Sequence, residues 1–203
     1  KECKDIRFDG NGYSAEWQEE AKRRGLDTET SVPLMIDQYL NEKSVKMFSS
    51  TGVLNEAELN SRCEVKWENY SMKLQIESRV LGDLVINHVI PAAKRYQTIL
   101  LQNVLSVKQV FDALEADTLN QQDILLIKRI ENHASAIVAG VEMMNKERAK
   151  ANHIDNQRER AITFHNHVVP LMEEIRKHVD DLEMVIDDQL WPLPKYRELL
   201  FIH

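Results

Sequence analysis

The chain has 203 residues, of which 43% are hydrophobic, 6% aromatic and 29% charged, and it contains only six Gly and five Pro. A chain of this length can bury one sizeable core, and its low content of glycine, proline and aromatic residues favours helices over β-sandwiches, β-barrels and disordered linkers. The 33 acidic residues outnumber the 26 Lys and Arg, giving a formal net charge of −7. This charge disfavours nucleic acid and anionic membranes as primary partners, because both would repel it.

Cysteine usage and the chain's first residues bear on location and completeness. Cys3 and Cys63 are too few for a disulfide framework, and neither belongs to a Cys-x-x-Cys pair. The sequence has no membrane-spanning apolar run and no signal-peptide pattern, so we expect a cytoplasmic protein. Because the chain starts at Lys1 without Met, and residues 8–14 are rich in turn formers, we expect a piece of a longer polypeptide. Residues 1–13 would then be a junction that follows an upstream folded unit.

Residues 14–54 are predicted to form an N-terminal arm of three short helices. Ser14 is a suitable N-cap for the first helix, and Gly25 is a suitable residue to end it. Pro33 favours the first turn of the second helix, and Gly52 should end the third. Each helix is too short to be stable without packing on a larger element.

The first long helix is predicted to run from Asn55 to Leu114. Asn55 and Glu58 form a capping-box pattern, after which apolar residues recur every three or four positions along one helix face. Pro91 removes one backbone donor from this helix, so we expect a bend there.

Two further long helices complete the predicted bundle over residues 55–188. Thr118 and Gln121 form a second capping-box pattern, and the last helix should span residues 155–188. Short connections favour antiparallel packing. The predicted fold is therefore all-α: an elongated antiparallel bundle of three long helices, with the small N-terminal arm and an extended, proline-containing C-terminal tail over residues 189–203.

A short repeat lies within two of these predicted helices. The sequence Asn-His-Val-Ile-Pro at 87–91 recurs as Asn-His-Val-Val-Pro at 166–170. Matched prolines would bend two packed helices together, but five residues are too few to separate this reading from coincidence, and both remain open.

The residue patterns predict no catalytic or metal site. Di-iron helical bundles need Glu-x-x-His pairs, and no histidine from His88 to His178 has a carboxylate three positions before it. Glu174 lies one turn before His178, and we expect the two to form at most an exposed ion pair. The sequence lacks a Gly-x-Ser-x-Gly elbow and a Walker motif, and Cys63 lies on the apolar stripe of the first long helix. We therefore predict that no residue here is catalytic, cofactor-binding or metal-binding.

Aromatic and apolar residues are instead predicted to anchor the arm, the bundle and the tail. Large amphipathic side chains near chain ends are typical of docking contacts. The predicted structural or interface anchors are Trp17, Trp67, Trp191, Tyr196, Leu200 and Phe201.

Several uncommon short sequence motifs occur in the same order as in one known protein family, which this chain resembles. FDGNGYS at 8–14, EAELNSR at 56–62 and the ending WPLP-x-Y at 191–196, followed by LLF at 199–201, are similar to the segment after the catalytic core of type III glutamine synthetases. The resemblance covers essentially the whole chain. Residues 104–160 contribute only a general helical pattern.

The resemblance implies a parent enzyme that ligates ammonia to glutamate with ATP, uses Mg or Mn held by glutamates, and forms a double-ring homo-oligomer. None of that family's nucleotide-, metal- or glutamate-binding motifs matches this chain, so its partners would be the upstream catalytic domain and other subunits. The chain alone would be an inactive scaffold or oligomer-contact domain. A stand-alone adaptor that binds a partner helix and a ligand-sensing regulatory bundle are the alternatives.

Overall fold

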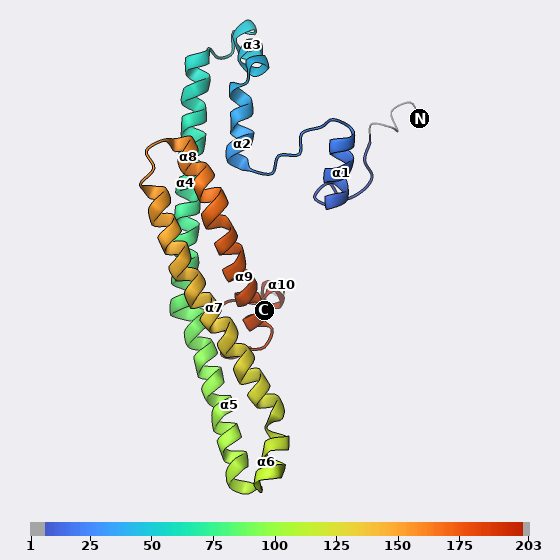
Figure 1. Cartoon of the computed structure of the whole chain (residues 1–203), viewed down its shortest axis with the longest axis vertical. Helices are drawn as coiled ribbons and strands as arrows, with labels where there is room; N and C mark the ends of the chain where they lie inside the picture. The colour runs from blue at the N-terminus through green and yellow to red at the C-terminus, as the bar shows by residue number, and fades with distance from the viewer. Residues whose placement is uncertain (1–6, 201–203) are drawn as a thin grey trace. The chain divides into compact units, whose positions relative to one another are not determined.

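The computed structural model describes residues 7–200, except the side chains of residues 196 and 197, and within that range it contains helices and no strands (Figure 1). The predicted all-α class is confirmed. The chain divides into two compact units, of which the first ends at Lys66 and the second begins at Trp67. The division falls inside helix α4 (Glu56–Leu84). None of the described helices is long and apolar enough to cross a lipid bilayer.

Short helices build the first unit together with the beginning of α4. They are α1 (Ala15–Arg23), α2 (Val32–Asp37), its 3₁₀ extension η2 (Gln38–Leu40) and α3 (Glu42–Ser50). Their ends follow local capping rules. The Ser14 hydroxyl accepts from the backbone N–H of Trp17, at 3.3 Å. Gly25 and Gly52 follow α1 and α3 with φ of 72° and 69°, a left-handed conformation that favours glycine.

A small apolar cluster joins α2 to the beginning of α4 within the first unit. Ile36, Leu59 and Cys63 are buried, and the Cys63 sulfur lies 3.9 Å from the carbonyl oxygen of Ile36. Burial raises the pKa of the Cys63 thiol. The Lys66 ammonium on α4 lies 5.3 Å from the centre of the Tyr39 ring on η2, which is a cation–π contact. The thiol is thus protonated at neutral pH and acts as a small apolar side chain.

The second unit contains the rest of α4 and the remaining described helices. In chain order these are the π-helical turn η3 (Val85–Val89), α5 (Ile90–Val110), α6 (Ala113–Leu119), α7 (Gln121–Asn152), α8 (Gln157–Thr163), the π-helical turn η4 (Phe164–Val168), α9 (Val169–Glu183) and α10 (Tyr196–Leu200). Helix α7 packs against both α5 and α9 (Figure 1).

The prediction that the first long helix continues to Leu114 is wrong. The helix ends at Val110, because Phe111 adopts an extended conformation with φ −108° and ψ 157°. Asp112 then caps α6, and its carboxylate accepts from the backbone N–H of Glu115 at 3.0 Å. The apolar periodicity continues through this break, so periodicity alone could not reveal it.

The predicted capping box of Thr118 and Gln121 is also wrong. Thr118 belongs to α6, where its hydroxyl donates to the carbonyl of Leu114 at 3.0 Å. Asn120 precedes α7, and its fully buried side-chain amide donates to the carbonyl of Val104 at 3.2 Å. This bond ties the turn between α6 and α7 to α5, so a long-range contact decides where α7 begins.

The prediction of an extended tail over residues 189–203 is correct only in part. Residues 191–195 are irregular, as expected around Pro192 and Pro194. Beyond them the chain forms the short helix α10, where the prediction is wrong. The backbone N–H of Lys195 donates to the Glu198 carboxylate at 3.2 Å. This bond satisfies a backbone N–H that has no carbonyl partner within the helix, because it lies at the helix start. Residues 201–203 lie outside the described part of the chain.

The pentapeptide repeat coincides with two π-helical turns. In η3 the N–H of Ile90 donates to the carbonyl of Val85, and in η4 the N–H of Val169 donates to the carbonyl of Phe164. Each π turn is followed directly by a helix with proline in its first turn. Proline cannot donate and clashes with the carbonyl of the preceding turn, and a one-residue widening relieves both conflicts. The repeat therefore has the same local structure in both copies. The helix predicted for 155–188 corresponds to α8, η4 and α9, but it ends at Glu183, so the predicted end at residue 188 is wrong.

Apolar side chains from α5, α7, α9 and the two π turns form the core of the second unit. Phe164 is the largest of the fully buried side chains. At its margin, the Glu131 carboxylate on α7 accepts from Lys94 and, at 3.1 Å, from Gln97 of α5. Hydrogen bonds from these two side chains lower the pKa of Glu131. The α5–α7 contact is thus apolar inside and ion-paired outside.

Gly140 sits where α7 meets α9, and replacing it with alanine is expected to destabilise the protein. A Cβ at this position would lie 2.9 Å from Cγ1 of Ile175, a buried β-branched side chain with little freedom to move. Overpacking costs about 1–3 kcal/mol, and the gain in helix propensity returns about 1 kcal/mol. We expect Gly140→Ala to lower the free energy of unfolding by about 1 kcal/mol, measured by urea denaturation.

Gly82 in α4 provides the matched control for this substitution. A Cβ at Gly82 would lie 3.7 Å from side-chain atoms of Met144 and Val141, which is ordinary van der Waals contact. Gly82→Ala should therefore raise the free energy of unfolding by about 0.5–1 kcal/mol through helix propensity. If Gly140→Ala stabilised the protein as much as Gly82→Ala, the close α7–α9 contact would be refuted.

Candidate functional site

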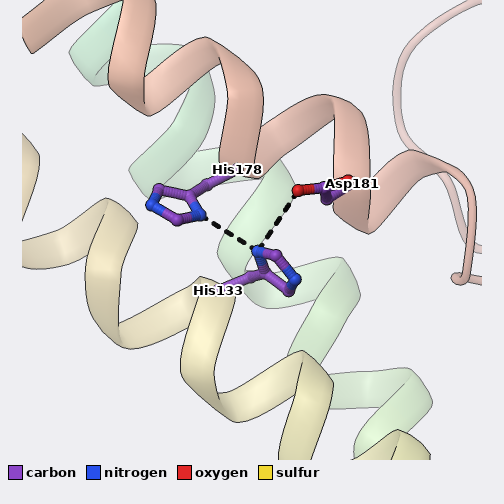
Figure 2. Close-up of side chains that lie close together, drawn as sticks. All are labelled: His133, His178 and Asp181. Atoms are coloured by element: carbon purple, nitrogen blue, oxygen red, sulfur yellow. Dashed lines mark hydrogen bonds and ion pairs between the residues drawn. The ribbon is translucent and has the colours of Figure 1, made fainter.

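Two histidines and an aspartate come together between α7 and α9 (Figure 2). His133 projects from α7, whereas His178 and Asp181 project from α9. The Nδ1 atom of His133 lies 3.0 Å from Nδ1 of His178 and 3.8 Å from Oδ2 of Asp181. Among the described residues, this is the only group of three or more His, Cys, Asp or Glu side chains whose ligand atoms lie within 4.8 Å of one another. We call it the His–His–Asp cluster.

The apolar packing of α7 and α9 explains why these side chains meet. His178 and Asp181 are three residues apart and therefore share one face of α9. His133 lies one position before the buried Ala134, at the edge of the apolar face of α7. Buried neighbours within one turn of the cluster hold both helices in register: Ile130, Ala134 and Ile137 on α7, and Ile175, Val179 and Leu182 on α9.

The surroundings of His133 favour the uncharged imidazole. Burial lowers the pKa of His133, and the nearby His178 and Arg129 lower it further, while the Asp181 carboxylate acts in the opposite direction. The His133 side chain is 16% exposed, whereas that of Asp181 is 52% exposed. A neutral imidazole offers one lone pair and one N–H, so one Nδ1 of the pair donates to the other. The cluster thus offers two imidazoles and a solvent-facing carboxylate.

Sequence reasoning missed this cluster. It paired His178 with Glu174 on the same helix, but in the structure Nδ1 of His178 contacts His133 on α7. The Glu-x-x-His pattern places the carboxylate before the histidine, whereas Asp181 comes three residues after His178. A His-x-x-Asp search would have found two of the three members, whereas His133 is 45 positions away in sequence and is brought in by helix packing.

The three tryptophans predicted as anchors occupy different environments. Trp17 is half-buried and packs against Phe8, with 4.8 Å between ring centres. Trp67 is 3% exposed, and Trp191 is 8% exposed and belongs to the core of the second unit. Trp191 therefore packs the segment after α9 onto its own unit. None of these contacts tests a role between subunits.

The predicted anchors at the C-terminal end are less buried or lie outside the described residues. Leu200 is 60% exposed at the end of α10. The side chain of Tyr196 and the whole of Phe201 lie outside the described part, so their predicted roles stay predictions.

A row of exposed apolar side chains lies on the outer face of α4. Met72, Ile76 and Val80 are spaced four residues apart and are 48%, 56% and 51% exposed. They occupy the face opposite the buried Leu74 and Ser78. We call these three side chains the α4 stripe; they did not figure in the sequence predictions, because both faces of α4 carry apolar residues.

The described residues thus form two helical units, and the second has an apolar core, an exposed apolar stripe and a His–His–Asp cluster. The family profile of the glutamine synthetase C-terminal domain matches residues 1–108. The chain belongs to this family, and the predicted resemblance to type III glutamine synthetases is confirmed.

Three curated relatives are similar over nearly the whole chain. A glutamine synthetase from Bacteroides fragilis (strain YCH46) is 47% identical over 196 residues, which cover 97% of this chain and 27% of that protein. A type-3 glutamine synthetase from Dictyostelium discoideum is 32% identical over 202 residues, covering 96% and 26%. A glutamine synthetase from Butyrivibrio fibrisolvens is 27% identical over 202 residues, covering 98% and 28%. The chain spans about a quarter of the length of these relatives.

Proposed function

We propose that this chain is a scaffold and oligomer-contact domain of a parent glutamine synthetase. The parent would join ammonia to glutamate with ATP in a catalytic domain of the same polypeptide, and this domain would hold subunits together. Family membership supports the parent activity. The α4 stripe is the observation that carries the contact role.

The α4 stripe has the pattern of a helix face that another protein surface covers. Single exposed apolar side chains are common and need no explanation. Three large ones at a spacing of four residues make a continuous row, which is the pattern of a helix–helix contact. Leu101 and Leu105 on α5 repeat this spacing at 46% and 60% exposure. In our proposal, other subunits cover these two rows of side chains. The helices that carry the rows belong to an antiparallel three-helix bundle, which holds both rows in a fixed position.

The cofactors of the parent reaction are assigned to the upstream domain. Mg and Mn prefer oxygen ligands. The His–His–Asp cluster offers two imidazole nitrogens and one carboxylate, so it does not fit the metal of an ATP-dependent ligase. ATP and Mg or Mn would therefore be held outside this chain, and the chain itself contributes no catalytic group to the proposed reaction.

The test compares the intact parent polypeptide with a version that carries Ile76→Glu and Val80→Glu. Burying two carboxylates in a subunit contact is unfavourable, so we expect a smaller assembly by light scattering. The 203-residue chain, given glutamate, ammonia, ATP and Mg, should form no glutamine. An unchanged parent mass would contradict the contact role, and glutamine formation by the chain would contradict the assignment of catalysis to the upstream domain.

A further inference from the structure

The donor atoms of the His–His–Asp cluster suit a particular class of ion. Imidazole nitrogens bind zinc, copper, nickel and iron, and carboxylates complete many such sites. The cluster offers two nitrogens and one carboxylate from two helices (Figure 2). Zinc sites with three protein ligands of these types leave one position for water. The 52% exposure of Asp181 gives that position access to solvent.

The spacing of the donor atoms is close to that of a metal-bound arrangement. In a tetrahedral zinc site with bonds of 2.0–2.1 Å, two ligand nitrogens lie about 3.3 Å apart. The Nδ1 atoms of His133 and His178 are 3.0 Å apart, and Oδ2 of Asp181 is 3.8 Å from the first of them. All three ligand atoms lie within 4.8 Å of one another. Side-chain rotations that shift these atoms by about 1 Å would therefore place all three around one ion.

We propose that His133, His178 and Asp181 together bind one divalent transition metal ion of the zinc type. The ion takes the place of the hydrogen bond between the two imidazoles. The imidazole that carries its proton on Nδ1 changes to the tautomer with the proton on Nε2, so both Nδ1 lone pairs reach the metal and no proton need be lost from the histidines. Water supplies the fourth ligand, and the bound ion links α7 to α9.

This inference is independent of the proposed role in assembly. Each helix alone contributes at most two ligands, so the ion binds only when α7 and α9 are packed together. Binding to the folded protein alone stabilises it. Zinc should therefore raise the melting temperature of the chain, a readout that requires no enzymatic activity.

The experiment titrates the metal-free 203-residue chain with ZnCl₂ in a calorimeter and with Co²⁺ in a spectrophotometer. We expect one ion per chain, an intense visible Co²⁺ spectrum of the tetrahedral kind, and a higher melting temperature with zinc. Asp181→Asn and His178→Ala should each weaken zinc binding at least tenfold. Asp181 is exposed, so its substitution should leave the fold intact, which far-UV circular dichroism verifies.

Two matched variants control for the general effect of replacing an aspartate or a histidine. Asp180→Asn alters the neighbouring carboxylate, which pairs with Arg176 at 3.0 Å, and His153→Ala removes an exposed histidine at the end of α7. Both should bind zinc like the unaltered chain. The proposal is overturned if the chain binds no zinc, or if Asp181→Asn and His178→Ala bind it as tightly as these controls.

Discussion

Replacing Phe164 with alanine is expected to lower the free energy of unfolding by about 4 kcal/mol. The side chain is fully buried in η4 and belongs to the apolar core of the second unit. Phe→Ala substitutions in cores cost about 3–5 kcal/mol, because they lose apolar transfer free energy and leave a cavity. The site lies between α8 and α9, where two helical segments limit the collapse that could fill this cavity. Urea denaturation followed by circular dichroism measures the loss.

Two comparison variants make this result specific. Met184→Ala changes a side chain that is 82% exposed and should alter the free energy of unfolding by less than about 0.5 kcal/mol. His165→Ala removes a contact of 2.9 Å to the Tyr70 hydroxyl and should cost about 1 kcal/mol. A loss at Phe164 no larger than that at His165 would contradict the packing described here.

Placing two negative charges on the α4 stripe is expected to abolish self-association of the isolated chain. In Ile76→Glu with Val80→Glu, two large apolar side chains that are 56% and 51% exposed become carboxylates. An interface that buries them loses apolar area and must desolvate both charges. The folded monomer should tolerate the change, because these positions face solvent within the chain. The mass-average molecular weight should fall to the monomer value of 23.6 kDa.

A control variant separates this effect from that of net charge. Gln122→Glu with Asn145→Glu adds the same two charges at exposed polar positions of α7. It should retain the mass of the unaltered chain. If both double variants dissociated equally, general charge repulsion and not the α4 stripe would explain the result.

Helix starts with local caps were predictable from sequence, and helix breaks fixed by distant contacts were not. Asn55 and Glu58 form the predicted reciprocal bonds, with backbone-to-side-chain distances of 2.8 and 2.9 Å. These bonds span three residues and depend on residue type alone. The break after Val110 and the start of α7 depend on Asp112 and on the Asn120 bond to the carbonyl of Val104. Residue types near 118–121 permit several caps, and tertiary contacts select one.

The candidate site was less predictable than the helices. Helical periodicity reveals which residues share one helix face, as His178 and Asp181 do. It does not reveal the register between two helices, which packing around Ile175 and Gly140 sets in this fold. His133 joins the cluster through that register. The π turns were hidden for a related reason: the repeat at 87–91 and 166–170 was visible, but the usual outcome of a helical proline is a kink.

The native mass of the 203-residue chain, measured by light scattering over a range of concentrations, shows whether this domain makes subunit contacts. Because we assign subunit contacts to this domain, we expect a stable multimer that persists on dilution and that Ile76→Glu with Val80→Glu converts to a monomer. A monomer at every concentration would contradict the claim and would assign assembly of the parent enzyme to its upstream domains.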